Sequence, residues 1–122
     1  MKIAEVIDIA KEQYPNQISE DQMLTWLKRL DMQIYEDTIC THEKPEDYEE
    51  PDFDNYNMLT ELIIPDIYAE TYECYLKMKI AQHLTESKRY GIEHTNYNNS
   101  LVTFQQWYNR HHMPLCVRPR YR

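Results

Sequence analysis

The chain has 122 residues, 21 acidic against 13 basic side chains, a net charge of −8 at neutral pH and a single glycine. This length corresponds to one domain, and the scarcity of glycine excludes a fold built from many tight hairpins, whose turns need positive φ. The negative charge opposes general binding to nucleic-acid phosphates, which requires a basic face.

The cysteines and the hydropathy pattern predict a soluble protein of a reducing compartment. The chain has three cysteines, an odd number, and they are widely spaced at Cys40, Cys74 and Cys116. This pattern excludes a disulfide framework. No secretory signal pattern opens the chain. The longest apolar run, Met113 to Val117, is far shorter than the about 20 residues that a membrane span requires.

The supply of core-forming residues is small. Leucine, isoleucine, valine and phenylalanine together make up only about a fifth of the chain, and eleven tyrosines supply further apolar surface. Tyrosine buries a large ring but keeps a hydroxyl that needs a partner. We therefore expect the domain to complete its burial against copies of itself or against another protein.

Two helices are predicted in the first third of the chain, over residues 2–13 and 20–40. Apolar residues of the first recur at helical spacing, and Pro15 ends it. Ser19 opens the second helix, because Ser-Glu-Asp-Gln has the form of a capping box. The apolar stripe of this second helix consists of Met23, Leu27, Leu30 and Ile34.

An acidic loop is expected over residues 42–57. Its like charges repel one another, and Pro45 and Pro51 disfavour regular structure. Such a loop is most often simply solvated, but it could also mimic DNA phosphates or line a passage through which DNA slides without binding. The candidate residues for these two roles are Glu46, Asp47, Glu49, Glu50, Asp52 and Asp54.

The third predicted helix covers residues 66–84, directly after Pro65. Its apolar residues lie on more than one face, and a helix that is apolar nearly all round is normally surrounded by neighbours. Because a chain of 122 residues has few neighbours to offer, we expect other copies of the chain to cover this helix.

The fourth predicted helix covers residues 88–112 and has the clearest periodicity of the chain. Gly91 and residues 96–100 are poor helix formers, so packing must stabilise it. Aromatic stripes of the last two helices could line a ligand pocket, but a stripe at helical spacing is more often a packing seam. The residues expected to pack between subunits are Tyr68, Tyr72, Tyr75, Tyr90, Tyr97, Phe104, Trp107 and Tyr108.

The elements together predict an all-α domain of about four helices over residues 1–112, followed by a basic tail over residues 113–122. The tail contains three arginines and no acidic residue. Its two prolines prevent a helix and predict an extended segment.

No pattern in the sequence predicts catalysis, a metal site or a cofactor. His111, His112 and Cys116 could combine with Cys40 and His42, but their spacing matches no common zinc signature. The sequence contains no glycine-rich phosphate loop, metalloprotease motif or nucleophile elbow. We therefore expect a protein that is not an enzyme.

Several motifs in order along the chain resemble a known family. They are Ile18-Ser19-Glu20-Asp21-Gln22 with Trp26-Leu27, then Ile34-Tyr35-Glu36 through Thr41-His42-Glu43, then Thr60-Glu61-Leu62-Ile63-Ile64-Pro65 followed by Tyr68 and Tyr75, then Arg89-Tyr90, and finally Phe104-x-x-Trp107-Tyr108-Asn109-Arg110-x-His112-Met113-Pro114. Together they look like a family of short head-tail connector or adaptor proteins of tailed bacteriophages and prophages of Gram-positive bacteria. The sequence departs from that family around residues 92–99, which leaves the register of the last helix open.

This resemblance implies a structural protein of the virion, located at the head-tail junction and assembled in the host cytoplasm. Its partners would be other copies of itself in a ring, the phage portal protein, and a head-closure or tail protein below, with DNA only as passing cargo and no membrane. The rival interpretation is a small acidic regulatory or inhibitor protein of the DNA-mimic type that acts on a host protein. The tail residues that would dock onto the portal are Pro114, Leu115, Val117, Arg118, Arg120 and Arg122.

Overall fold

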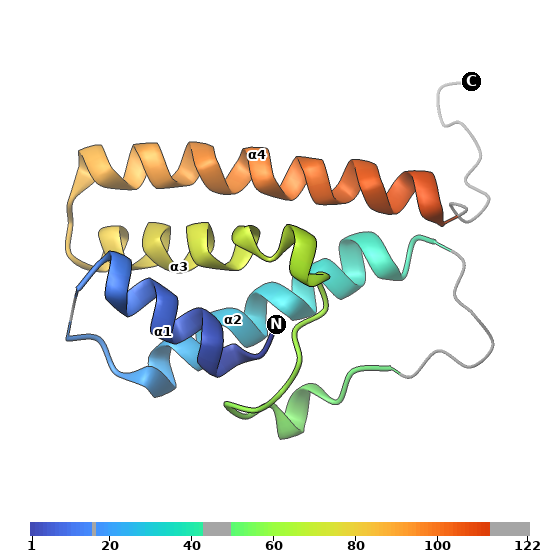
Figure 1. The fold of residues 1–122 in the computed structure, drawn as a ribbon, viewed down its shortest axis with the longest axis horizontal. Helices are drawn as coiled ribbons and strands as arrows, with labels where there is room; N and C mark the ends of the chain where they lie inside the picture. Colours follow the sequence, from blue (N-terminus) through green and yellow to red (C-terminus); the bar gives the residue numbers. More distant parts are fainter. Residues whose placement is uncertain (16, 43–49, 113–122) are drawn as a thin grey trace.

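The computed structural model describes residues 1–15, 17–42 and 50–112, and this part of the chain folds into an all-α domain (Figure 1). Its four α-helices are α1 (Ile3–Gln13), α2 (Glu20–Ile34), α3 (Glu70–His83) and α4 (Ser87–His111). A π-helical turn, η1 (Tyr35–Ile39), continues α2, and two short 3₁₀ turns, η2 (Phe53–Asn55) and η3 (Asp66–Tyr68), lie between η1 and α3. The predicted all-α fold of about four helices is confirmed.

The helix ends agree with the sequence pattern except where other helix types intervene. Ser19 caps α2 as expected, with its hydroxyl accepting a hydrogen bond from the Gln22 backbone N–H at 3.2 Å. The predicted helix 20–40 is α-helical only to Ile34 and then widens into η1. The predicted helix 66–84 begins with the 3₁₀ turn η3, and its α-helical part starts at Glu70.

Helices α3 and α4 form an antiparallel pair joined by a tight turn. Thr85 adopts the left-handed conformation there, with φ of 57°. The backbone N–H groups of Thr85 and Glu86 donate to the carbonyls of Gln82 and Ala81, at 3.2 and 2.9 Å. This is the Schellman arrangement that closes an α-helix, and it sends α4 back along the full length of α3.

Helix α3 lies at the centre of the fold, between α4 on one side and the α1 and α2 pair on the other (Figure 1). No side chain from Thr71 through Ala81 is exposed, and Tyr72, Leu76 and Ile80 are fully buried. The expectation that other copies must cover this helix is therefore wrong. The chain covers it with its own three other helices, because buried tyrosine and threonine add to the small aliphatic core.

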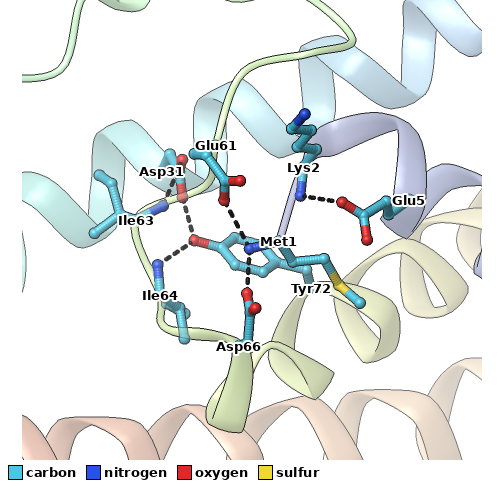
Figure 2. A network of polar contacts seen from close by, with 9 residues as sticks. All are labelled: Met1, Lys2, Glu5, Asp31, Glu61, Ile63, Ile64, Asp66 and Tyr72. Atoms are coloured by element: carbon cyan, nitrogen blue, oxygen red, sulfur yellow. Dashed lines mark hydrogen bonds and ion pairs between the residues drawn. The ribbon is translucent and has the colours of Figure 1, made fainter.

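The segment before η3 pairs with the start of the chain. The backbone N–H groups of Ile3 and Leu62 donate to the carbonyls of Thr60 and Met1, at 3.1 and 3.0 Å. The amino group of Met1 forms ion pairs with Glu61 and Asp66 (Figure 2). This pairing holds residues 57–66 across the bundle, where they form one wall of the groove described below.

Candidate docking groove

A groove of about 680 Å³ lies where residues 50–65 pass the carboxyl end of α4. We call it the C-terminal groove. Its buried and half-buried lining is mostly apolar and aromatic, and its exposed lining includes the acids Glu50, Asp52 and Glu61. The apolar and aromatic lining side chains include Ile39, Ile63, Pro65, Phe104, Trp107 and Tyr108.

A buried carboxylate fixes one wall of the groove. Asp31 is completely buried in α2, and its Oδ1 accepts a hydrogen bond from the Tyr72 hydroxyl at 2.5 Å. Its Oδ2 accepts from the Tyr56 hydroxyl at 2.7 Å and from the Ile63 backbone N–H at 3.3 Å. The Tyr72 hydroxyl in turn accepts from the Ile64 N–H at 2.8 Å, as Figure 2 shows. This network ties the groove residues Tyr56 and Ile63 to α2 and α3.

Burial dominates the electrostatics of this network. Desolvation raises the pKa of Asp31 to about 6, although the hydrogen bonds from Tyr72, Tyr56 and the Ile63 N–H oppose that rise. Burial and the neighbouring Asp31 carboxyl raise the pKa of the Tyr72 hydroxyl well above its ordinary value. Asp31 therefore acts as an acceptor that organises the wall, and its charge is not accessible from the groove.

A second polar contact ties η1 to the end of α4. The ring of His42 is buried, with Nδ1 2.6 Å from the Thr38 carbonyl and Nε2 2.6 Å from the Asn109 side-chain oxygen. The backbone carbonyl of Thr38 only accepts, so Nδ1 donates in that contact, whereas the Asn109 amide carries both an acceptor and a donor for Nε2. The ring also packs edge-on against Tyr108, with centroids 4.8 Å apart. His42 is thus held as a structural pin and is not exposed as a base.

Aromatic and imidazole rings cover the end of α4 beside the groove. Tyr108 and His112 stack with ring centroids 3.9 Å apart, and Trp107 lies 4.9 Å from the His111 ring. Tyr68 of η3 contacts Trp107 at 5.5 Å. Trp107 and His112 are only half-buried, so this cluster offers ring surface to a ligand or a peptide.

The predicted subunit-packing residues lie mostly in the seam between α3 and α4 of one chain. For Tyr72, Phe104 and Tyr108 the expectation is wrong, because the chain itself buries them. Tyr75 and Tyr97 pack against each other with centroids 5.1 Å apart, and burial raises the pKa of Tyr97 to about 12. The remaining members, Tyr68, Tyr90 and Trp107, are half-buried.

The loop and tail residues are only partly placed by the structure. Glu50, Asp52 and Asp54 are exposed, and the first two line the C-terminal groove whereas Asp54 does not. The other predicted loop and tail residues lie outside the described residues: Glu46, Asp47, Glu49, Pro114, Leu115, Val117, Arg118, Arg120 and Arg122.

Asp31 and His42 were not predicted as site residues. Asp31 follows Leu27 by four positions and precedes Ile34 by three, so it stands within the apolar stripe of α2. A carboxylate on the buried face of a helix must be hydrogen-bonded, and this signal could have identified it. The contact of His42 with Asn109 links positions 67 residues apart and has no local signal.

The outer face of α4 is a second surface of interest. Residues 94–109 contain no aspartate, glutamate, lysine or arginine. The hydroxyls of Thr95 and Thr103 donate to carbonyls of their own helix, at 3.0 and 2.9 Å, so neither requires an outside partner. We call this surface the α4 outer face; its exposed members are Ile92, Thr95, Asn96, Asn99, Val102, Thr103 and Gln106.

Comparison with models of protein families, with curated proteins and with solved structures finds no match. Among residues 1–15, 17–42 and 50–112, no helix has both the length and the apolar character to cross a bilayer. Within the same residues, no three histidine, cysteine or acidic side chains gather closely enough to hold a metal ion. Cys116, one of the residues considered above for a zinc site, lies outside the described residues.

Proposed function

We propose that this chain is a structural, non-catalytic subunit of the head-tail connector of a tailed bacteriophage or prophage. Copies of it would form a ring under the portal protein and help to join head and tail around the DNA channel. The family resemblance supports this proposal. So does the meeting of its motifs in space, since His42 of the Thr-His-Glu motif contacts Tyr108 and Asn109 of the last motif.

The α4 outer face is the observation that carries the proposal. A chain of net charge −8 repels its own copies, and at physiological salt that repulsion acts over about 8 Å. Copies can therefore pack most closely where a face carries no charge. Asparagine and threonine are also weak helix formers, so their position on an exposed helix face is better explained by contact with a neighbour than by helix stability.

The exposed acids fit the same role. Asp54 lies on η2, Asp52 directly precedes it, and both are exposed. A negative surface beside a channel repels DNA phosphates, so passing DNA would not bind there. The acids would then face either the channel or the next ring below.

Two added charges on the α4 outer face test the proposed ring contact. In the variant Asn99→Asp with Gln106→Glu, nearly isosteric side chains gain a negative charge at two exposed positions. We expect self-association, alone or with portal protein, to weaken by roughly tenfold or more, because like charges would face each other at the contact. Light scattering measures the change.

The matched control is Gln33→Glu with Gln82→Glu, which adds the same charge at exposed positions on α2 and α3. It should associate nearly as the unmodified chain does. Light scattering that shows only monomer, both alone and with portal, would overturn the connector proposal. Equal weakening in both double variants would show that overall charge, and not this face, governs association.

The tail supplies a separate prediction about the portal. Deleting residues 114–122 removes three arginines and none of the residues of the four described α-helices, so we expect unchanged helicity by circular dichroism. Attachment to portal-containing heads should be lost, because Leu115 and Val117 would bury against the portal while the arginines pair with acids. A truncated chain that still attaches would show that the tail is not the anchor.

A further inference from the structure

We propose that, in the free chain, residues 113–122 dock into the C-terminal groove of their own molecule. This inference does not depend on the connector proposal, since it concerns contacts within one chain. The groove is open among the described residues, and the segment that would fill it begins directly after the last of them, His112.

Chain continuity brings the segment to the groove. His112 is the last described residue and itself lines the groove, so residue 113 begins at its edge. Ten further residues, when extended, span up to about 33 Å. The loop between the groove and the segment is short, so little entropy is lost in closing it. A tethered segment meets its site at an effective concentration near the millimolar range.

The chemistry of the two partners is complementary. The segment begins with the apolar run Met113 to Val117 and ends with three arginines separated by Pro119 and Tyr121, and it contains no acid. The groove presents the partly open rings of Trp107 and His112 and the exposed carboxylates of Glu50 and Asp52. Extended proline-containing segments dock on aromatic-lined grooves because little backbone entropy is lost. Leu115 and Val117 would contact the rings while the arginines pair with the carboxylates.

The same docking would control when the tail is available. A tail held in the groove cannot bind another protein. A second protein therefore releases the tail only if it binds residues 113–122 more tightly than the groove does. The free subunit would then keep its apolar tail residues covered until that partner is present.

A spin label on Cys116 tests the proposal in the full chain. Cys116 lies in the segment itself and carries the label, and Cys40 is replaced by serine. Cys74 is buried and burial raises the pKa of its thiol, so Cys74 does not react with the label. With a nitroxide on Cys116, we expect a several-fold loss of the NMR signal of the Trp107 indole N–H. Reduction of the nitroxide should restore the signal.

Asp52→Lys and Asp54→Lys form the matched pair. Both replace an exposed carboxylate in the η2 region and change the net charge equally, but only Asp52 lines the groove. We expect Asp52→Lys to recover part of the Trp107 signal and Asp54→Lys to leave it fully suppressed. The recovery is partial because Cys116, four residues from His112, stays within about 14 Å of the groove edge even when undocked. Changing Arg118 and Arg120 to glutamate in the Asp52→Lys chain should restore the suppression. Amide spectra verify that each variant is folded.

Three results would overturn the inference. The first is an unchanged Trp107 signal in the spin-labelled full chain. The second is the same response to both lysine variants, which would mean that overall charge acts and not the groove. The third comes from mixing spin-labelled chains with isotope-enriched, unlabelled ones: suppression in the enriched chains would assign the groove to the tail of a second copy.

Discussion

At the scale of single residues, Asp31 shows how a charged group can serve a fold. It is completely buried, yet it accepts hydrogen bonds from two tyrosine hydroxyls and one backbone N–H. These donors join α2 to α3 and to the segment that forms the groove wall. The cost is desolvation of the carboxylate, which raises its pKa to about 6.

This pKa predicts how stability varies with pH. Because the folded pKa lies above the ordinary value of 3.8, the folded state binds the proton more tightly than the unfolded state. The Asp31 contribution is therefore most favourable below about pH 4, and it is lost as pH rises through about 6. Some two pKa units correspond to about 3 kcal/mol.

The variant Asp31→Asn isolates this contribution, because it cannot titrate. We expect the free energy of unfolding of the unmodified chain, minus that of the variant, to fall by about 2.5 kcal/mol between pH 4 and pH 7.5, because a small part of the full difference is already lost at pH 4. Urea denaturation at a series of pH values measures it. A difference that stays flat with pH would contradict the prediction, whatever its absolute size. Asp8→Asn, at an exposed position of α1, is the control for the loss of one carboxylate.

At the scale of elements, local signals predicted the helices and long-range contacts decided the rest. The apolar spacing of α1 and α4 and the Ser19 cap of α2 are readable in the sequence. The π-helical turn at Tyr35 is not, because the apolar pattern continues through it to Ile39. The pairing of residues 57–66 with the first residues also has no local signature, since it joins segments about 60 positions apart.

The prediction that other copies of the chain cover α3 is wrong for a physical reason. Counting aliphatic residues understates the core, because Tyr72 and Asp31 are both fully buried. A hydroxyl or carboxylate that finds a partner allows its side chain to occupy core volume. Tyr72 and Asp31 satisfy each other in this way. The groove at the end of α4 escaped prediction because its walls come from segments far apart in the sequence.

Gly91 in α4 gives a prediction at this scale. It lies within a regular helix, and a Cβ atom placed there meets nothing within 4 Å. Gly91→Ala should therefore stabilise the isolated chain by about 1 kcal/mol, because alanine loses less backbone entropy on folding. In a domain of this size that raises Tm by roughly 4 °C or more, which calorimetry measures. A lower Tm would show that α4 needs the glycine for a reason absent from the single chain.

At the scale of the whole molecule, burial and charge have separate roles. The single chain closes its own core around α3, so any association must use surface that is exposed in the folded protomer. The α4 outer face is free of charge along residues 94–109, whereas exposed acids occur on α1, α2, η2 and α3. Under the connector proposal, contact with other copies and repulsion of DNA phosphates would use different parts of one small surface.

The last prediction concerns duplex DNA. Binding to DNA depends on lysine and arginine neutralising phosphates and releasing counterions, and three of the 13 basic residues belong to the tail, so the rest of the chain is more negative still than −8. We expect no measurable duplex binding at physiological salt in fluorescence anisotropy. Only weak binding that disappears steeply with added salt would be compatible with the tail arginines acting alone. Nanomolar affinity at physiological salt would contradict a channel in which DNA passes without being held, and it would require a basic surface formed between subunits.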